Sequence, residues 1–421
     1  MSRPRIAVVG GGLAGMAAAL ACGDAGADVT LCEARPRLGG ATFSTELQGL
    51  EVDNGQHVFL RCCSEYLGFL DRVGARERTR IQPRLAIPVL TPDGVTSWLR
   101  RAPLPAPLHL APALLRYGPL SLGERLRLVP AARRLAALDL ADPALDRSSF
   151  GDWLARNGQS PRAIERFWDL VTRPTVNLPA AEASLALAAK VFQTGLLQAP
   201  DAADVGWAAV PLAQVHGAPA ERALQRLACD ALVLAAPHED AAKLLPDAAG
   251  LDAAALGKLG SSPILNLHSV WDRRVLSHPF AAGVGTPLEW IFDRSEAAGL
   301  ERGQYLAVSL SAADRWVGRS AESLREIFEP AFRALLPAAR EAKLVQFFTT
   351  CEPAATFRGA PGTRALRARA ETRVPGLYLA GAWTDTGWPA TMEGAVRSGR
   401  AAARAALCGL GRTQGLPQVA A

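Results

Sequence analysis

Residues 5–15 decide the fold, and they read Arg-Ile-Ala-Val-Val-Gly-Gly-Gly-Leu-Ala-Gly. The first five form a short, mostly apolar run, which is typical of a strand buried on both faces of a parallel sheet. In the glycine turn that follows, Gly10 permits a tight turn, Gly12 lets the backbone approach a pyrophosphate, and Gly15 lets helix and strand pack closely. The helix expected over 13–25 offers free N–H groups and a partial positive charge to phosphates.

A second strand, expected at residues 28–32, ends directly before Glu33. An acidic side chain at this place meets the ribose hydroxyls of a bound dinucleotide. Strand, glycine turn, helix, strand and acid therefore stand in the order of a βαβ nucleotide-binding unit. The alternative is a glycine turn within a core that binds no ligand.

Two further segments favour FAD over NAD, since both cofactors use this unit. Glu33 is followed by Ala34-Arg35-Pro36-Arg37-Leu38-Gly39-Gly40, which brings a second backbone segment and an arginine beside the cofactor. Near the C-terminus, a strand at 376–381 leads through a loop to a helix over about 391–407. A second helix N-terminus suits the flavin, because its dipole can stabilise the anionic reduced ring. Small residues at 394–399 would let this helix pack close to the cofactor.

The rest of the chain predicts a second, interleaved domain, because 421 residues exceed one ordinary core. Prolines interrupt Leu-rich stretches between 85 and 205, which favours a mostly helical insertion. Further strands are expected at 231–235, 263–270 and 304–310, and a helix at about 320–335. The predicted class is α/β, a Rossmann-like FAD-binding domain with a parallel sheet plus an interleaved substrate domain of mixed sheet and helices. The expected ranges are 1–84, 206–246 and 345–421 for the FAD-binding domain, and 85–205 and 247–344 for the substrate domain.

Composition excludes several other classes of protein. With 49% hydrophobic and 20% charged residues, the chain can bury a core and is not disordered. Its net charge of +6 comes from scattered arginines without the basic stripe of a nucleic-acid binder. No secretory signal and no run of 18 apolar residues is found, so we expect a cytoplasmic protein. The cysteines show no metal-binding spacing, and the vicinal Cys62 and Cys63 are expected at alternating strand or loop positions.

Several of these segments together resemble the amine oxidase and phytoene desaturase superfamily of flavoproteins. The resemblance is carried by Gly10–Gly15, Glu33, Arg35, Gly39-Gly40, Gly381–Asp385 and Gly394–Gly399. Residues 52–63 (Val-Asp-Asn-Gly-Gln-His-Val-Phe-Leu-Arg-Cys-Cys) and 386–395 (Thr-Gly-Trp-Pro-Ala-Thr-Met-Glu-Gly-Ala) resemble a narrower group, the squalene-associated FAD-dependent desaturases. The characterised activity of that group is hydroxysqualene dehydroxylase. The similarity runs over nearly the whole chain.

The resemblance implies which residues contact FAD. The expected cofactor-binding residues are Gly10, Gly12, Leu13, Ala14, Gly15, Glu33, Ala34, Arg35, Gly39, Gly40, Ala41, Asp385, Met392, Glu393 and Gly394. Gln56 and His57 would lie beside the isoalloxazine, and Trp388 is a third candidate to face the flavin. Many amine oxidases have an arginine where this chain has Ala41, which leans away from that branch.

The reaction implied is the reductive dehydroxylation of hydroxysqualene to squalene, in which the hydroxyl leaves as water and reduced FAD supplies hydride. Its partners would be a long-chain isoprenoid and a separate electron donor. Apolar segments at 99–138 could line a tunnel, and their arginines could seat this face peripherally on a membrane. A solvated surface over an ordinary core is the alternative there. For the whole chain, the alternatives are a carotenoid-type desaturase, another flavin oxidoreductase or a truncated, non-catalytic member. No catalytic acid can be assigned from the sequence.

One departure from the family lies before Ala231. Relatives place an extra segment there, with a strand that contacts the adenine of FAD and a small β-meander. Here a helical stretch at 219–228 runs directly into the strand. Such a short connection is physically ordinary, but it leaves a sheet edge uncovered. We therefore expect weakened FAD affinity or a partly degenerate family member.

Overall fold

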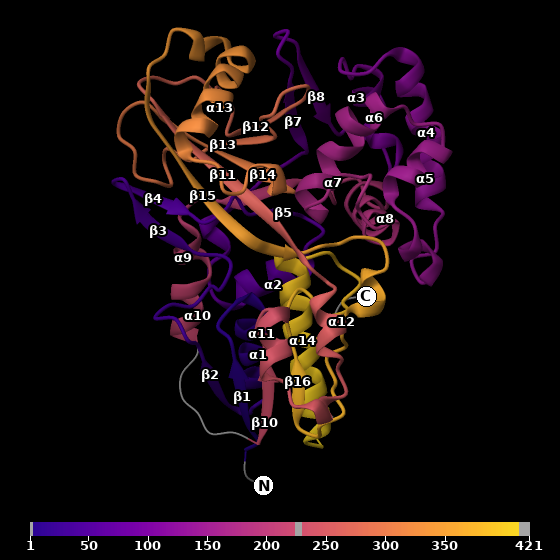
Figure 1. The fold of residues 1–421 in the computed structure, drawn as a ribbon, viewed down its shortest axis with the longest axis vertical. Helices are drawn as coiled ribbons and strands as arrows, with labels where there is room; N and C mark the ends of the chain where they lie inside the picture. Colours follow the sequence, from indigo (N-terminus) through magenta and orange to yellow (C-terminus); the bar gives the residue numbers. More distant parts are fainter. Residues whose placement is uncertain (1–2, 224–229, 412–421) are drawn as a thin grey trace.

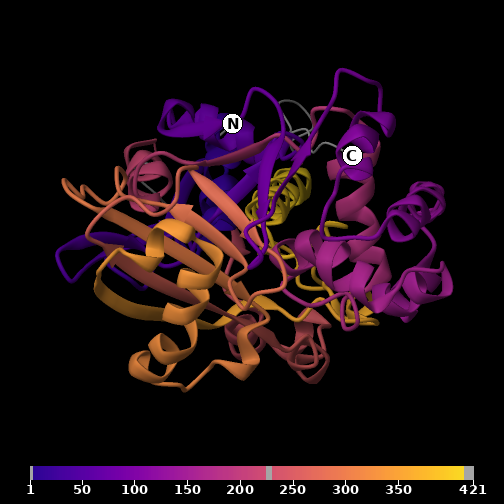
Figure 2. The ribbon, with the colours of Figure 1, turned by 90° about the horizontal axis from the view of Figure 1, so that it is seen from above.

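Two sheets follow one another along the long axis of the molecule, and a helical unit lies beside the upper one (Figure 1). The computed structural model describes residues 3–223 and 230–411. Seen from above, the seven-stranded sheet and the helical unit stand side by side (Figure 2). The connection at 219–228, which we expected to be helical, lies partly outside the described residues. Its described beginning belongs to α10 (Gly217–Ala223).

The lower sheet is parallel and has the strand order β16-β10-β1-β2. Its strands are β1 (Arg5–Val9), β2 (Asp28–Cys32), β10 (Ala231–Leu234) and β16 (Leu377–Leu379). Helices α1 (Leu13–Asp24) and α14 (Met392–Gly409) cover one face. Helices α11 (His238–Leu244) and α12 (Ala253–Gly257) cover the other. The central β1 is an apolar run because it is buried between these two layers. The predicted α/β class with a Rossmann-like parallel sheet is confirmed.

Small residues let α1 and α14 cross at backbone distance. A Cβ on Gly399 would collide with the carbonyl oxygen of Ala14 and lie 2.9 Å from the nitrogen of Ala18. The Ser398 hydroxyl accepts a hydrogen bond from the Gly381 N–H at 2.9 Å. These residues, which we expected to bring α14 close to the cofactor, thus pack it against α1 and the end of β16.

The upper sheet is mixed and has the order β15-β11-β14-β13-β12-β7-β8. Its strands are β7 (Ala86–Leu90), β8 (Thr96–Arg100), β11 (Ser261–Trp271), β12 (Phe280–Gly283), β13 (Trp290–Asp293), β14 (Gln304–Ser311) and β15 (Leu344–Phe357). Helix α13 (Ala321–Leu335) packs Leu324, Phe328 and Phe332 on one face, with the spacing of a single helix side. Because β15 pairs with β11, the domain boundary expected at residue 345 would have to move past Phe357. The two-domain division stays a prediction.

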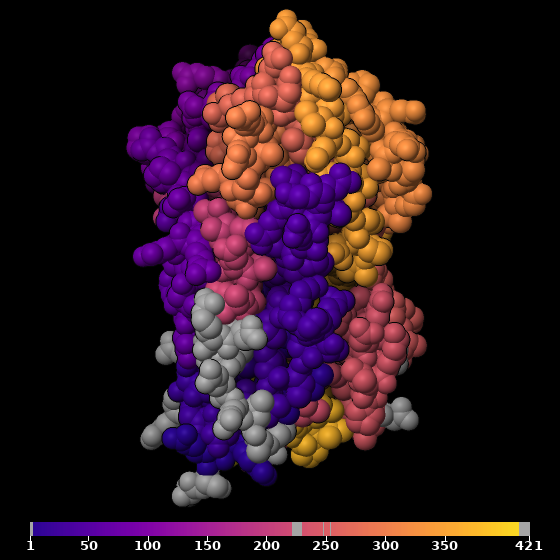
Figure 3. Space-filling model, turned by 90° about the vertical axis from the view of Figure 1, so that its left-hand side faces the viewer, coloured from indigo at the N-terminus to yellow at the C-terminus, as the bar shows by residue number. Residues whose placement is uncertain are grey.

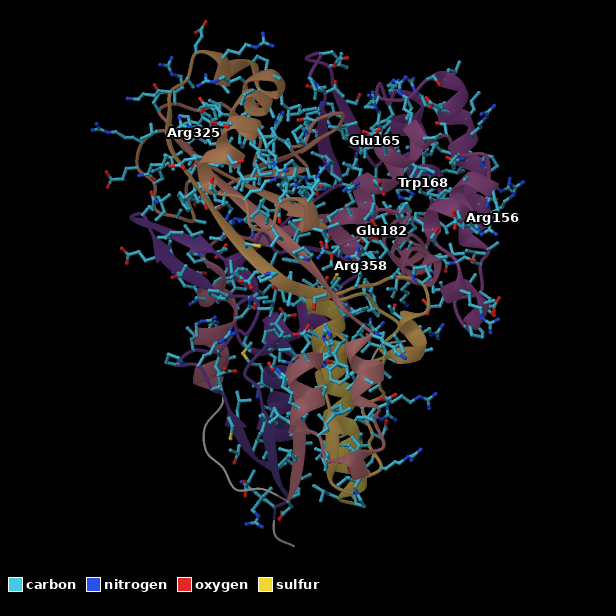
Figure 4. The ribbon with its side chains drawn as sticks, viewed as in Figure 1. Arg156, Glu165, Trp168, Glu182, Arg325 and Arg358 are labelled. Carbon is cyan, nitrogen blue, oxygen red and sulfur yellow. The ribbon has the colours of Figure 1, made fainter. Side chains whose placement is uncertain are left out.

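The insertion is mostly helical, as expected, although its first part supplies β7 and β8. Its helices are α3 (Ala111–Leu115), α4 (Leu122–Ala136), α5 (Phe150–Arg156), α6 (Pro161–Ala163), α7 (Asp169–Val176) and α8 (Leu185–Phe192). Trp168 lies in the middle of this unit and packs on Phe150 and Phe192 (Figure 4). An ion pair of Glu182 with Arg358, labelled in the same view, joins the unit to the end of β15.

Short elements connect the two sheets. They are β3 (Ser44–Leu47), β4 (Leu50–Asp53), β5 (Val58–Leu60), α2 (Ser64–Arg72), β6 (Thr79–Ile81), β9 (Val205–Ala208) and α9 (Leu212–Val215). The β3–β4 hairpin packs Leu50 and Val52 against the upper sheet. Figure 3 shows this side, where indigo N-terminal residues lie directly below the orange residues of that sheet. Cys62 and Cys63 form a turn, and Cys63 is the N-cap residue of α2.

Candidate functional site

Of the three motif glycines in the turn between β1 and α1, only Gly12 has room beside it for a ligand. Gly10 has φ +105°, and a Cβ there would lie 2.6 Å from the carbonyl oxygen of Ala235. A Cβ on Gly15 would collide with the carbonyl oxygen of Gly10. At Gly12, by contrast, the nearest described atom is the Gly40 Cα at 3.8 Å. Gly10 and Gly15 therefore serve the fold, whereas Gly12 leaves space for a bound group.

The amino-terminal end of α1 faces this space. Gly12 is its N-cap residue, and no side chain among the described residues caps it. The first-turn N–H groups of a helix have no acceptor within the helix, and together with its dipole they form an anion site. Leu13, Ala14 and Gly15 lie in this first turn, where they were predicted to bind the cofactor. The observed geometry fits a pyrophosphate.

Glu33 and the Gly39-Gly40 segment lie beside the glycine turn. The Glu33 carboxylate accepts hydrogen bonds from the N–H groups of Gly11, at 2.6 Å, and Arg35, at 2.9 Å. The Gly39 N–H donates to the carbonyl oxygen of Gly11 at 2.8 Å. The glycine turn and the Gly39-Gly40 segment thus form one wall of the site. The Glu33 carboxylate is held in this wall at the place where an acid would meet the ribose hydroxyls.

The arginine that reaches into this wall is Arg37. Its Nη1 donates to the carbonyl oxygen of Gly40 at 3.3 Å, and its guanidinium lies 3.7 Å from the centre of the Phe43 ring. The side chain of Arg35, which was predicted to contact FAD, is exposed. Two other predicted contact residues, Ala34 and Ala41, are exposed as well. The sequence offered two arginines two residues apart, and only their contacts distinguish them.

The C-terminal loop is held by a buried arginine that the sequence reasoning did not identify. Arg367 donates to the carbonyl oxygens of Trp383, at 3.2 Å, and Ala382, at 3.1 Å. Burial lowers the pKa of Arg367 to about 10. The exposed Asp385 follows in the same loop and accepts from the Gly387 N–H at 3.3 Å. The loop therefore presents Asp385 to the outside on a fixed backbone.

Trp388 combines a buried ring with an unsatisfied donor. Its Nε1 is buried and has no hydrogen-bond partner among the described residues. The Arg397 guanidinium lies 4.8 Å and the Lys190 ammonium 5.4 Å from its ring centre. A buried N–H without an acceptor is costly, so this position fits an acceptor on a bound group.

The Glu393 carboxylate is used by the protein itself. It accepts from the Tyr66 N–H at 2.7 Å, in the first turn of α2, and forms a 2.7 Å ion pair with Arg397. The neighbouring Gly394 N–H donates to the Thr391 hydroxyl at 3.1 Å, which caps α14. The Glu393 carboxylate and the Gly394 N–H are thus engaged within the protein, and a contact of the Met392–Gly394 turn with FAD stays a prediction.

Gln56 and His57 line a small hollow that opens to solvent. Other parts of its wall are Trp207, Phe292 and Arg294. His57 Nδ1 lies 3.0 Å from the carbonyl oxygen of Gly55, and burial is the main cause that lowers the pKa of its imidazole. Its ring is therefore neutral at neutral pH, which suits a contact with an uncharged ring system more than proton donation.

A buried ion pair fixes the same hollow. The Arg294 Nη2 lies 2.7 Å from Asp53 Oδ2, and both side chains are less than 10% exposed. Arg294 also donates to the carbonyl oxygen of Ala208 at 2.6 Å. The pair joins the end of β4 to the end of β13, so the residues between Asp53 and His57 are anchored to the upper sheet.

A second group of charges, partly buried, lies between α7 and the upper sheet. Glu289 accepts from the Ser311 N–H at 3.0 Å, and the Arg173 guanidinium lies 3.6 Å from its other oxygen. Burial raises the pKa of Glu289 to about 7. Arg173 also lies 3.5 Å from Asp169, whose pKa is likewise raised by burial. No sequence pattern pointed to these acids, because they come together only through packing.

Two of the histidines outside the motifs, His216 and His268, have structural partners. His216 lies 2.7 Å from the Tyr66 hydroxyl, and burial lowers its pKa to about 3. His268 lies 2.7 Å from the Tyr305 hydroxyl and 2.9 Å from the Thr350 hydroxyl. Both are buried and uncharged, so neither is a candidate for proton transfer at neutral pH.

Comparison with known proteins identifies relatives over nearly the whole chain. The family profile described as "Flavin containing amine oxidoreductase" matches residues 13–198 and 216–407. A hydroxysqualene dehydroxylase of Sinorhizobium fredii is 28% identical, over 95% of this chain and 97% of its own. A zeta-carotene desaturase of Zea mays is 33% identical, but only over 40% of this chain and 31% of its own. The structure of cyclohexylamine oxidase from Brevibacterium oxydans is 18% identical and superposes with a TM-score of 0.71 over 98% of this chain and all of that one.

The first of these alignments spans 440 positions, more than this chain has residues. That relative therefore carries residues that this chain lacks. Among the described helices, none is both long and apolar enough to cross a lipid bilayer.

Proposed function

The chain belongs to the flavin containing amine oxidoreductase family and is an FAD-dependent oxidoreductase, and we propose that its reaction is the reductive dehydroxylation of hydroxysqualene to squalene. The observation that carries this proposal is the match of a hydroxysqualene dehydroxylase over 95% of this chain and 97% of its own length. The carotenoid desaturases share less than half of the chain. A reaction shared with the hydroxysqualene dehydroxylase would explain why the similarity extends over the expected substrate domain as well as over the expected FAD-binding domain.

The residues of this chain bind and orient the cofactor in the proposed site. Gly12 and the first turn of α1 hold the pyrophosphate, and the Glu33 carboxylate holds the ribose. Gln56, His57 and Trp388 would face the flavin end of the cofactor. FAD, when bound and reduced, supplies the hydride. The protein positions the substrate and keeps water away from the reacting carbon.

The proposed substrate is apolar apart from its hydroxyl group, and the wall beside the hollow suits it. Phe280, Trp290 and Phe292 come from neighbouring strands and pack with Val58 and Leu60 of β5, the strand that begins directly after His57. In the proposal, the long-chain isoprenoid makes apolar contact with Phe292 and Trp207, which line the hollow, while the other aromatic side chains support them from the core. The electrons come in this proposal from a separate donor, since the chain has one dinucleotide fingerprint. A cytoplasmic location with peripheral membrane contact belongs to the same proposal.

A carotenoid-type desaturase is the second candidate, supported by the 33% identity to the maize enzyme over 177 residues. It would run the flavin in the oxidative direction. The experiment is an anaerobic single turnover: flavin bound to the purified protein is photoreduced and mixed with hydroxysqualene, and lipids are extracted and analysed by mass spectrometry. We expect squalene in proportion to the reduced flavin, together with flavin reoxidation.

Three results would contradict the proposal. Unchanged hydroxysqualene with flavin that stays reduced would exclude the reaction. Reduction of the oxidised flavin by a polyene substrate, with new double bonds formed, would favour the desaturase. A cooperatively folded chain that binds no FAD at any concentration would favour the non-catalytic alternative.

A further inference from the structure

Exposed apolar side chains gather on one part of the helical unit. Ten large hydrophobic side chains are exposed among the described residues, and seven of them lie between residues 95 and 129. We define the apolar patch as Leu104, Leu108, Leu115, Leu122, Leu126 and Val129, whose exposed fractions range from 43% to 62%. They belong to α3, α4 and the proline-rich segment before them, and these elements pack on one another. Single exposed leucines are ordinary, but a group of six in one segment marks an interaction surface.

Helix α4 is apolar on two opposite sides. Its inner side places Leu128 and Leu135 in the core of the helical unit, where both are at most 1% exposed. Its outer side carries Leu122, Leu126 and Val129, which follow one another at the spacing of a single helix face. The core therefore explains the inner side, whereas the outer side needs a different partner.

The same segment is strongly basic. Residues 94–138 contain one acidic residue, Glu124, and seven arginines: Arg100, Arg101, Arg116, Arg125, Arg127, Arg133 and Arg134. Glu124 accepts from the hydroxyl groups of Ser160, at 2.6 Å, and Ser121, at 2.8 Å, within the cap of α4. Arg101 is neutralised by the buried Asp204, with a distance of 2.8 Å.

Two of the other arginines keep their charge while being held in place. Arg125 donates to the carbonyl oxygens of Leu120 and Leu115, each at 2.8 Å, and Arg134 donates to Asn157 at 3.0 Å. All these partners are uncharged. The elements that carry the apolar patch thus also carry fixed positive charge, which is complementary to an anionic surface.

We propose that the apolar patch docks the protein on an anionic lipid bilayer. Its leucines would enter the interfacial region, and the arginines would contact phosphate headgroups. A second copy of this chain is a less suitable partner, because docking patch to patch would bring two basic surfaces together. The inference rests on the proposed function in one respect: the proposed substrate, a long-chain isoprenoid, partitions into the bilayer on which the protein would dock.

The position of the patch agrees with this arrangement. Helices α3 and α4 lie at the upper outer edge of the molecule, far from β1 and β2 at the opposite end (Figure 1). They also form an outer side of the helical unit when seen from above (Figure 2). A protein docked by this edge keeps its nucleotide-binding end in water, where a separate electron donor can reach it.

The test is flotation of the FAD-loaded protein with vesicles. We expect binding to vesicles of phosphatidylglycerol mixed with phosphatidylcholine, weak binding to phosphatidylcholine alone, and release by high salt. The variant Leu122→Gln/Leu126→Gln/Val129→Gln should lose binding at least about tenfold, because interfacial affinity scales with buried apolar area. The matched control is Leu244→Gln/Val317→Gln/Val345→Gln, whose side chains are 61%, 44% and 53% exposed elsewhere. It should bind like the parent protein.

The alternatives give different outcomes. No flotation with anionic vesicles, or equal loss in both triple variants, would overturn the proposal. Light scattering that shows a dimer in the parent and a monomer in the first variant would assign the patch to a second copy instead. Flotation requires no turnover, so a failed dehydroxylase assay leaves this result readable. The first variant should also keep the parent's melting temperature, since its three side chains are exposed.

Discussion

Two glycines of the nucleotide turn differ in what a methyl group would meet. At Gly12 the space is open and φ is −75°, which alanine adopts without strain. We expect Gly12→Ala to leave the melting temperature unchanged and to weaken FAD binding by about tenfold or more, because the methyl group occupies the place of the pyrophosphate. Gly15→Ala collides with Gly10 and should destabilise the fold itself. Thermal unfolding and flavin titration separate the two effects.

The control for this pair lies in the same helix. A Cβ on Gly23 would meet no atom within 4 Å. Gly23→Ala should therefore keep FAD affinity and gain stability by up to about 1 kcal/mol, the helix preference of alanine over glycine. Unchanged FAD affinity in Gly12→Ala would place the pyrophosphate elsewhere.

Glu289 predicts a pH dependence of stability. The pKa of an ordinary glutamate is about 4.3, and burial raises that of Glu289 to about 7. Between these values the folded state holds a proton that the unfolded state has lost, so the free energy of unfolding falls as pH rises through this window. Glu289→Gln removes this dependence. Its stability relative to the parent should rise from near zero at pH 5 to at most about 3 kcal/mol at pH 8.

Urea unfolding at both pH values measures this difference. The exposed Glu326 provides the control, since Glu326→Gln should give the same small change at pH 5 and at pH 8. A Glu289→Gln variant whose stability relative to the parent is equal at both values would mean that the carboxyl group titrates normally.

At the scale of elements, β2 forms the outer edge of the parallel sheet. Its residues Asp28–Leu31 are half-buried and Cys32 is exposed, as expected of a strand without a covering segment. If the adenine wall is missing, the AMP half of FAD contributes little to binding. We then expect FMN to bind within about tenfold of FAD, a difference below about 1.4 kcal/mol. Titration of protein purified without added flavin, followed by fluorescence, gives both affinities.

The opposite result would show an adenine site formed by other residues. Stoichiometric FAD in the protein as purified, or FAD binding more than about a hundredfold tighter than FMN, would contradict weak adenine binding. The Gly12→Ala variant serves as control here, because loss of the pyrophosphate contact should weaken FAD more than FMN, which has a single phosphate.

The sequence predicted the elements that depend on local patterns. The strands at 5–9 and 28–32 are confirmed, because a buried parallel strand reads as an apolar run followed by a turn. The pairing of β15 with β11 was not predicted, since the two strands are far apart in the chain and most residues of β15 are only partly buried. The use of Glu393 to cap α2 was missed for the same reason: the contact spans more than 300 residues. Long-range packing assigns these roles, and a single sequence does not display it.

At the scale of the whole molecule, one buried ion pair joins the end of β4 to the upper sheet. Asp53 binds Arg294 and also accepts hydrogen bonds from the Ser44 hydroxyl, at 2.7 Å, and the Leu212 N–H, at 2.9 Å. Arg294→Met leaves the carboxylate buried without its cation and should cost about 3–5 kcal/mol of unfolding free energy. In Asp53→Asn/Arg294→Met the uncompensated charge is gone, while an amide oxygen still accepts from Ser44 and Leu212. The double variant should therefore be more stable than Arg294→Met alone.

This order of stabilities distinguishes a buried charge pair from a surface contact. The exposed pair of Arg325 and Glu329 on α13 is the comparison, with a distance of 2.9 Å and an Arg325 side chain 49% exposed (Figure 4). Arg325→Met should change stability by less than about 1 kcal/mol. If Arg294→Met is as mild as Arg325→Met, β4 and the upper sheet are held together by apolar packing alone. If the double variant is the least stable, the cost of Arg294→Met comes from lost packing of the arginine stem and not from the stranded carboxylate. Either result would mean that the ion pair does not fix Gln56 and His57 relative to the upper sheet. There would then be no reason to expect the proposed flavin end of the site and the aromatic side chains of β12 and β13 to move as one body.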